Sequence, residues 1–301
     1  MGYSQALDWQ ADALRFIDSS TGEQLCRAQL KTAEGDYARA GLGLPPLDYL
    51  KYGKCLVDSL AYGDPYYWSS EMCDLLGKTS ADMPDWTFKA DVLPSTEGCF
   101  YFSRPLALDA WETRDSDLVA ISWCRVRPAE GEAISGVLLA FWTQMPMRPS
   151  GVPVTMFSWS FNEKMSSLWS IAEGSIPIKN KGRFLGKVRA FATACAFIQQ
   201  RILVTQRERP ERHTRKRVAD IWEHEPHVRI VKLRREVSGD QPAGNGRPVA
   251  WSCQWVVSGF WRQQYYPSAD EHRPIYILPY IKGPVGMPLK APATKVFEVI
   301  R

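Results

Sequence analysis

The chain has 301 residues, of which 45% are hydrophobic and 23% are charged, and these values exclude a protein that is disordered throughout. The net charge of +4 is too small to indicate a nucleic-acid-binding protein by itself. No apolar run approaches the roughly twenty residues of a membrane-spanning helix, and the first residues do not have the pattern of a secretory signal. Seven cysteines stand singly along the chain, which predicts reduced thiols in a cytoplasmic protein.

The first eighty residues have the pattern of helices. Leu7, Ala11, Leu14 and Ile17 recur at helical spacing. The aromatic run 66–68 (YYW) follows a Gly-Asp-Pro turn and precedes the serines of an expected helix N-cap. We expect these three rings to pack between helices, and a ligand-facing aromatic shelf is the alternative.

From about residue 91 the apolar period changes to two, which predicts strands. Four expected strands form an antiparallel meander, because turns rich in Gly, Pro and Asp join them: 98–104, 118–126, 134–143 and 152–161. The third is almost continuously apolar, so both of its faces should be covered. A long core helix is then predicted over 184–208, and a basic helix over 211–222.

The last part of the chain has the pattern of strands at 228–235, 249–266, 274–282 and 295–300. Gly259 is expected to form a bulge, and Pro279 to mark a sheet edge or a bulge. The sequence therefore predicts an α+β protein: a helical N-terminal part, an antiparallel sheet, a long core helix plus a basic helix, and a C-terminal antiparallel β unit. The expected domains are 1–208 and 209–301, which could pack as one body.

Several familiar sites have no counterpart in the sequence. It contains no G-x-x-x-x-G-K-[ST] loop, no G-x-G-x-x-G and no G-x-S-x-G, so we predict no cofactor. His224 and His227 are three residues apart, but Pro226 breaks any helix that would align them on a metal. We therefore expect solvated histidines and no metal site there.

The predicted basic helix contains the run RHTRKR at 212–217. Its cations are candidates for binding nucleic-acid phosphates: Arg212, Arg215, Lys216 and Arg217. Two alternatives remain open at this point. The helix could be a solvated face with salt bridges to nearby glutamates, or it could meet an acidic protein.

The predicted hairpin 248–284 places aromatic residues among Arg262, Arg273 and Lys282, as stacking on unpaired bases requires. An alternative function is that of a metal-independent ribonuclease. His272 would then be the acid or base, with Arg262, Arg273, Tyr276 and Lys282 stabilising phosphorane charge. Many of these residues could instead complete the fold, with Trp255, Val257 and Phe260 in a core and the arginines stacked on rings.

The segment 251–289 resembles the C-terminal signature of a family of uncharacterised actinobacterial and actinobacteriophage proteins. The shared pattern runs approximately W-x-V-x-G-H-W-R-x-Q-x-Y-P-S and then H-R-P-I-x-I-x-P-x-x-K-G-P. This chain has Phe260 where the family often has histidine, which weakens any nuclease function built on that position. Segments 93–106 and 212–217 are similar to further family motifs. The resemblance implies a bacteriophage or mobile-element protein in an actinobacterial cytoplasm, without an established activity.

Our leading hypothesis is a non-enzymatic phage or mobile-element accessory protein that acts in host takeover or anti-defence. It would bind nucleic acid or a host nucleic-acid-processing machine, with the basic helix and the hairpin on one common face. The alternatives are the metal-independent ribonuclease or toxin acting through His272, Arg262 and Lys282, and a protein-only inhibitor of a host factor. No membrane is expected as a partner, and the sequence does not define the oligomeric state.

Overall fold

The computed structural model describes residues 2–39, 49–84, 86, 88, 90–106, 118–126, 136–145, 148–160, 181–200, 202–222, 225–234, 253–284 and 286–290. The chain divides into two compact units, Met1–Arg234 and Arg235–Arg301. Helices and strands occur together, which confirms the predicted α+β class. The expected strand at 295–300 lies outside the described residues.

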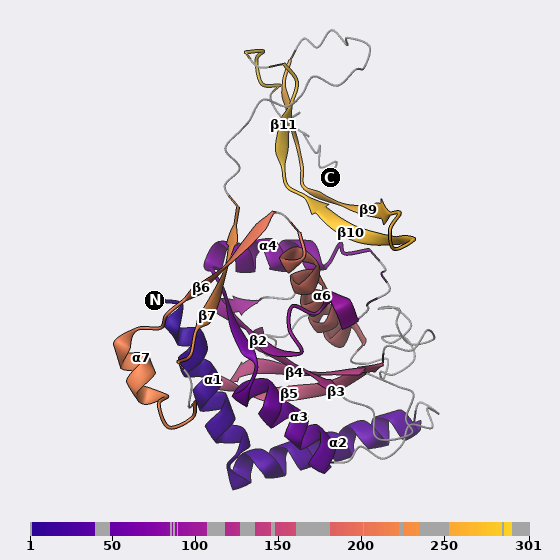
Figure 1. Ribbon diagram of the computed structural model, residues 1–301. Helices are drawn as coiled ribbons and strands as arrows, with labels where there is room; N and C mark the ends of the chain where they lie inside the picture. Colours follow the sequence, from indigo (N-terminus) through magenta and orange to yellow (C-terminus); the bar gives the residue numbers. More distant parts are fainter. Residues whose placement is uncertain are drawn as a thin grey trace, which may run out of the picture. The chain divides into compact units, whose positions relative to one another are not determined.

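The first unit contains a seven-stranded sheet with the strand order β5-β4-β3-β2-β1-β7-β6 (Figure 1). Its strands are β1 (Asp64–Trp68), β2 (Glu97–Leu106), β3 (Leu118–Val126), β4 (Gly136–Met145), β5 (Arg148–Ser160), β6 (Leu203–Glu208) and β7 (Val228–Leu233). The meander β2–β5 is antiparallel, as the sequence predicted. However, β1 runs parallel to β2 on one side and to β7 on the other, so the sheet is mixed.

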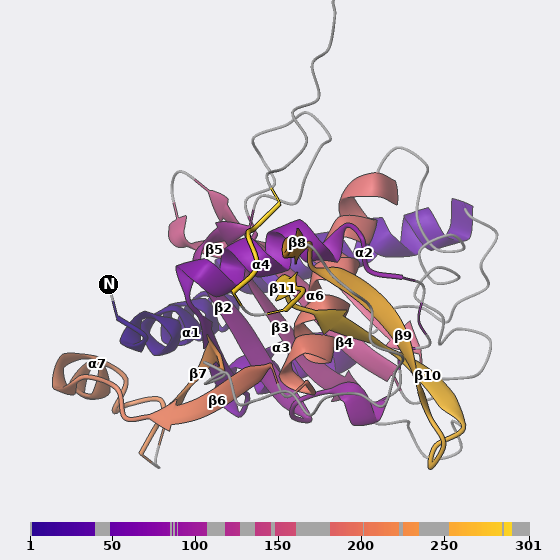
Figure 2. The same ribbon diagram turned by 90° about the horizontal axis from the view of Figure 1, so that it is seen from above.

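Helices cover both faces of this sheet (Figures 1 and 2). One face carries α1 (Ser4–Ile17), α2 (Ser20–Arg39) and α3 (Tyr49–Ala61). The other carries α4 (Ser70–Ser80) and α6 (Lys181–Ile198). Parallel neighbours need a crossover connection, and α4 with the short η1 (Ala90–Val92) provides it between β1 and β2.

The aromatic run 66–68 belongs to β1, a strand that the sequence did not predict among the expected helices of the first eighty residues. Tyr66 and Trp68 lie on one face, where their ring centroids are 5.6 and 5.5 Å from that of Phe100. Tyr67 points to the other face and stacks on Tyr101 at 6.3 Å. The alternation of strand side chains thus distributes the three rings between the two helical layers.

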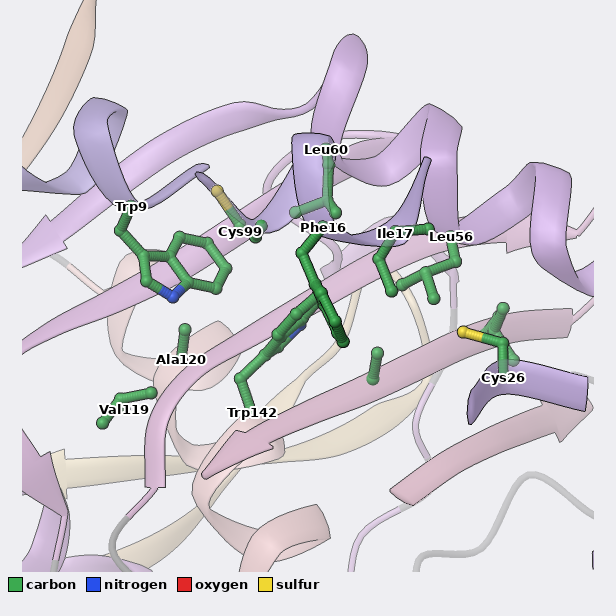
Figure 3. Close-up of a cluster of buried hydrophobic side chains, with 13 residues drawn as sticks. Trp9, Phe16, Ile17, Cys26, Leu56, Leu60, Cys99, Val119, Ala120 and Trp142 are labelled. Carbon is green, nitrogen blue, oxygen red and sulfur yellow. The ribbon is translucent and has the colours of Figure 1, made fainter. Parts of the chain in front are cut away.

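The core on the α1 side is built around tryptophans (Figure 3). The rings of Trp9 and Trp142 meet edge to face at 5.4 Å, and Phe16 points toward them from the same helix as Trp9. Trp142 is fully buried, and its Nε1–H donates to Ser122 Oγ at 3.0 Å. This hydrogen bond satisfies the indole inside the apolar layer and fixes the ring orientation.

The predicted helix 184–208 ends earlier than expected. Helix α6 stops at Ile198, and the following residues turn so that β6 can pair antiparallel with β7. The apolar stripe of the helix is confirmed for Val188, Phe191 and Cys195, which are all buried. Pairing with β7 across the sheet outweighs the local helical pattern beyond that point.

The second unit contains two short antiparallel sheets, which pair β9 (Phe260–Tyr266) with β10 (Glu271–Ile277) and β8 (Trp255–Val257) with β11 (Tyr280–Lys282). The two sheets share one pairing register, and the ladder between them is interrupted at Gly259 and Pro279. A Cβ atom at residue 259 would overlap the Tyr276 hydroxyl, and Pro279 has no N–H for a ladder bond. A bulge was expected at Gly259, but the register is the same on both sides of this residue, so the ladder is interrupted there without a bulge.

The boundary between the units falls after Arg234, whereas the sequence suggested one near residue 208. Strand β7 lies beyond residue 208 and pairs with both β1 and β6 in the main sheet. Helix α7 (Arg212–Arg217), which is shorter than the predicted 211–222, also belongs to the first unit.

We predict that Gly98→Ala lowers the free energy of unfolding by about 1–3 kcal/mol, as overpacking of a dense core does. Gly98 lies opposite Trp123 in the β2–β3 register, and a Cβ atom there would overlap the indole ring. Urea unfolding followed by tryptophan fluorescence measures the effect. Gly2→Ala is the matched control, because its added methyl meets only the end of the Glu211 side chain. Equal stability of the two variants would contradict the packing argument.

Candidate binding surfaces

The basic helix α7 is attached to α1 by charged hydrogen bonds. Arg217 Nη1 donates to Asp8 Oδ1 at 2.7 Å, and Nη2 donates to Asp12. Thr214 Oγ1 donates to the second oxygen of Asp8 at 2.9 Å. The hydrogen bonds to Asp12 and Asp8 raise the pKa of Arg217 above its usual value. Arg217 is therefore a tie between two segments distant in sequence.

Further contacts hold both ends of α7. Arg15 Nη2 donates to the Arg217 carbonyl at 2.9 Å and to Asp220 at 3.1 Å. At the other end, the Glu211 N–H donates to Ser4 Oγ at 2.9 Å. We call this set of contacts, which joins α1 to Glu211, Thr214, Arg217 and Asp220, the α1–α7 clasp.

The sequence-predicted cations of α7 thus have different environments. Arg217 belongs to the clasp, and Arg215 lies 3.5 Å from Glu225, which also pairs with Arg209. Arg212 and Lys216 are exposed and make no ion pair with another described residue. The salt-bridged alternative therefore describes two of the four predicted α7 cations, Arg215 and Arg217, although the partners of Arg217 are aspartates of α1 and not nearby glutamates.

The register of the β9–β10 hairpin divides the other predicted site residues between two faces. His272 lies opposite Tyr265, and their rings are 5.1 Å apart. Arg262 and Arg273 occupy positions of the other parity, opposite Ile275 and Gln264. The imidazole and the two guanidiniums therefore do not converge on one phosphate, and this arrangement does not support the ribonuclease assignment. Tyr276 is buried against Trp261 at 5.3 Å.

The three predicted site cations of the second unit all lie near polar groups or rings. Arg273 pairs with Glu271 and lies 5.8 Å from the Tyr266 ring centroid. Arg262 donates to Gln264 Oε1 at 2.7 Å, and Lys282 lies 5.9 Å from the Trp255 ring centroid on the separate β8–β11 sheet. The expected stacking of an arginine on a ring is thus found for Arg273.

Large exposed hydrophobic side chains are concentrated in the second unit. Eight of them lie there: Val256, Phe260, Tyr265, Tyr266, Tyr280, Ile281, Met287 and Leu289. The described part of the first unit has three: Tyr62, Val204 and Leu233. Within 253–284 and 286–290, only Pro274 and Tyr276 are buried. Val256, Ile281 and Leu289 were not predicted as site residues, because the alternation of a strand shows which residues share a face but not whether another element covers that face.

A small cavity of about 60 Å³ lies in the first unit near the start of β1. Gln10, Asp64, Arg207 and His227 are among the residues that line it. Asp64 is already paired with Arg229 at 2.7 Å. The volume suits one or two water molecules and is far below that of a typical substrate pocket.

The described ranges contain no group of three or more His, Cys, Asp or Glu side chains that could hold a metal ion, and His224 lies outside them. All seven cysteines are free thiols, and burial raises the pKa of Cys26 to about 11, which suppresses its reactive thiolate. No described helix combines the length and the apolar character that a membrane crossing requires.

Comparisons with known proteins give little further guidance. No protein-family model matches the chain, and no curated protein sequence matches it. A solved structure, titled crystal structure of AcrVA2, aligns with 93% of this chain and 94% of that chain at 12% identity and a TM-score of 0.42. Similarity at this level carries no argument about the present fold or function. The proposals below therefore depend on the residues of this chain.

We predict that Arg217→Ala lowers the free energy of unfolding by about 1–2 kcal/mol, because two aspartates lose a charged partner that is about two-thirds buried. Thermal and urea unfolding measure this loss. Arg212→Ala is the matched control, since Arg212 is exposed outside the clasp, and it should change stability by less than about 0.5 kcal/mol. If Arg217→Ala were as stable as the control, the clasp would have no structural role.

Proposed function

We propose that this protein is a phage or mobile-element accessory protein that binds a host protein through the second unit. The observation that carries this proposal is the apolar surface of that unit, where eight large hydrophobic side chains are exposed. A concentration of exposed large apolar side chains often marks a site of protein association. The mobile-element setting implied by the sequence resemblance supports a host factor as the partner, such as a component of nucleic-acid processing.

Three aliphatic side chains form the most exposed part of this surface. Val256 and Ile281 lie directly opposite each other in the β8–β11 register, and each is 59% exposed. Leu289, which is 54% exposed, bridges to Gln254 on the same face as Val256. We call Val256, Ile281 and Leu289 the aliphatic face. Full burial of such a side chain stabilises an interface by about 1.5–3 kcal/mol.

The chemistry of the aliphatic face favours a protein over nucleic acid. Aliphatic side chains cannot pair with phosphates, and they stack on bases less well than aromatic rings do. In the first unit, Arg215 and Arg217 are engaged by carboxylates. A partner with its own apolar patch would satisfy this surface and would provide the core that the described part of the second unit lacks.

We predict that the double variant Val256→Asp, Ile281→Asp loses a host partner that the native protein retains. Two carboxylates in the centre of the aliphatic face would have to be desolvated on binding. The measurement is affinity capture from a nuclease-treated actinobacterial lysate, followed by mass spectrometry of the retained proteins. Nuclease treatment excludes partners that are bridged by nucleic acid.

The matched control is Tyr62→Asp, which places a carboxylate at a hydrophobic residue of the first unit that is 75% exposed. This variant should retain the partner. Circular dichroism of each variant verifies the fold. If no host protein depends on the aliphatic face, or if the double variant captures the same proteins as the native chain, the proposal is rejected.

A second candidate partner is single-stranded nucleic acid at the hairpin. Phe260 and Tyr266, which are 44% and 38% exposed, flank Arg262 on one face of β9. An arginine between accessible rings is a suitable platform for stacked bases.

For this candidate, Phe260→Ala with Arg262→Ala should weaken binding of a fluorescent oligothymidine at least about tenfold at low salt, since each stacked base contributes about 1–3 kcal/mol. Fluorescence anisotropy measures the affinity. Arg212→Ala with Lys216→Ala tests the basic helix separately, because these cations are exposed outside the clasp. Unchanged affinity in the hairpin variant would eliminate the hairpin as a nucleic-acid site.

A further inference from the structure

Strand β6 is an edge strand of the seven-stranded sheet, and its outer side has no neighbouring strand in that sheet. Its inner side pairs with β7 from Leu203 to Glu208 without a register shift. The Arg234 N–H donates to the Ile202 carbonyl at 2.8 Å just before this register begins, which identifies the hydrogen-bonded positions. Since bonded and non-bonded pairs alternate in an antiparallel ladder, the backbone groups of Thr205 and Arg207 point away from β7.

This edge has few of the features that normally prevent strand addition. The strand has six residues, LVTQRE, and contains neither proline nor a bulge. No described residue hydrogen-bonds to the backbone of Thr205 or Arg207, and Figure 2 shows β6 at the margin of the sheet. Val204 is 40% exposed on the same strand. The edge therefore presents two N–H groups and two carbonyls in the spacing of a missing neighbour strand.

The side chains around this edge define the charge of a complementary strand. Arg207 lies directly opposite Arg229, whose charge is already paired with Asp64. Like charges at opposite positions destabilise a sheet, and Arg207 has no ion pair with another described residue. Lys232 and Arg234 on and just after β7 are also exposed and unpaired within the described ranges. An incoming strand with carboxylates would relieve this excess of positive charge.

We propose that the outer edge of β6 binds an extended acidic segment of a partner protein as an eighth strand. Thr205 and Arg207 would exchange backbone hydrogen bonds with it. A carboxylate beside Arg207 and a β-branched side chain beside Val204 would supply the side-chain pairing. This site is in the first unit and is independent of the aliphatic face, so either proposal can fail alone.

The test uses the full chain and a capped eight-residue peptide in which glutamate alternates with valine and threonine. A peptide with lysine in place of glutamate is the control ligand. Peptide affinity is measured by fluorescence anisotropy, and amide hydrogen exchange of Thr205 and Arg207 is measured by NMR. We expect the glutamate peptide to bind at least tenfold more tightly than the lysine peptide. We also expect it to slow exchange at both amides at least tenfold.

Two variants separate backbone pairing from general charge attraction. Thr205→Pro removes an outward N–H while leaving the bonds to β7, and it should reduce glutamate-peptide affinity at least tenfold. Thr205→Val is its matched control and should bind like the native chain. Arg207→Glu keeps the backbone donor and should reverse the preference in favour of the lysine peptide, which keeps the proposal testable if Thr205→Pro does not fold.

Four results would each overturn the proposal. They are no binding at millimolar peptide, equal binding of the two peptides, no protection of the Thr205 and Arg207 amides, and undiminished binding by a folded Thr205→Pro variant. Sedimentation supplies a further decisive outcome. A native dimer that becomes a monomer in Thr205→Pro would assign the edge to a second copy of this chain instead.

Discussion

The position of β1 between β2 and β7 is the constraint on which the first unit depends. Parallel pairing on both sides joins β2, the first strand of the meander, to β7, which begins more than 120 residues after β2 ends. It also fixes which face each ring of the 66–68 run occupies. Tyr66 and Trp68 pack with Phe100 beneath α4 and α6, while Tyr67 stacks on Tyr101 toward α1. The central strand therefore connects the two apolar layers in addition to connecting the two parts of the sheet.

That arrangement explains the environment of the basic helix. Because β7 is paired with β1, the segment that precedes β7 and contains α7 passes along α1. There the carboxylates of Asp8 and Asp12 accept hydrogen bonds from a cation of α7. This cation is Arg217, whose charge is paired with the two aspartates and therefore contributes little to a positive surface that a partner could bind. A run of arginines and lysines in sequence thus becomes a mixed set in the fold, in which some cations stabilise a contact and others face solvent.

The second unit differs from the first because its described part is a long hairpin with almost no buried core. Its long hairpin is defined by one register, by an interruption at Gly259 and Pro279, and by alternation that separates His272 from Arg262. What its described part lacks is a core, since only Pro274 and Tyr276 are buried. A small β unit of this kind needs further apolar cover to offset the entropy of ordering its chain. This is the physical basis for regarding it as a binding element.

The sequence by itself determined the local patterns: the α+β class, the meander β2–β5 and the apolar stripe of α6. These follow from the period of the apolar side chains. Whether the α7 cations and the hairpin cations share one face stays a prediction. Only the tertiary structure decided that residues 66–68 form a central strand, that β6 replaces the end of the long helix, and that Arg217 is bound by Asp8 and Asp12. Each depends on a partner distant in the chain, and local sequence carries no information about which distant segment will supply the hydrogen bonds or the opposite charge.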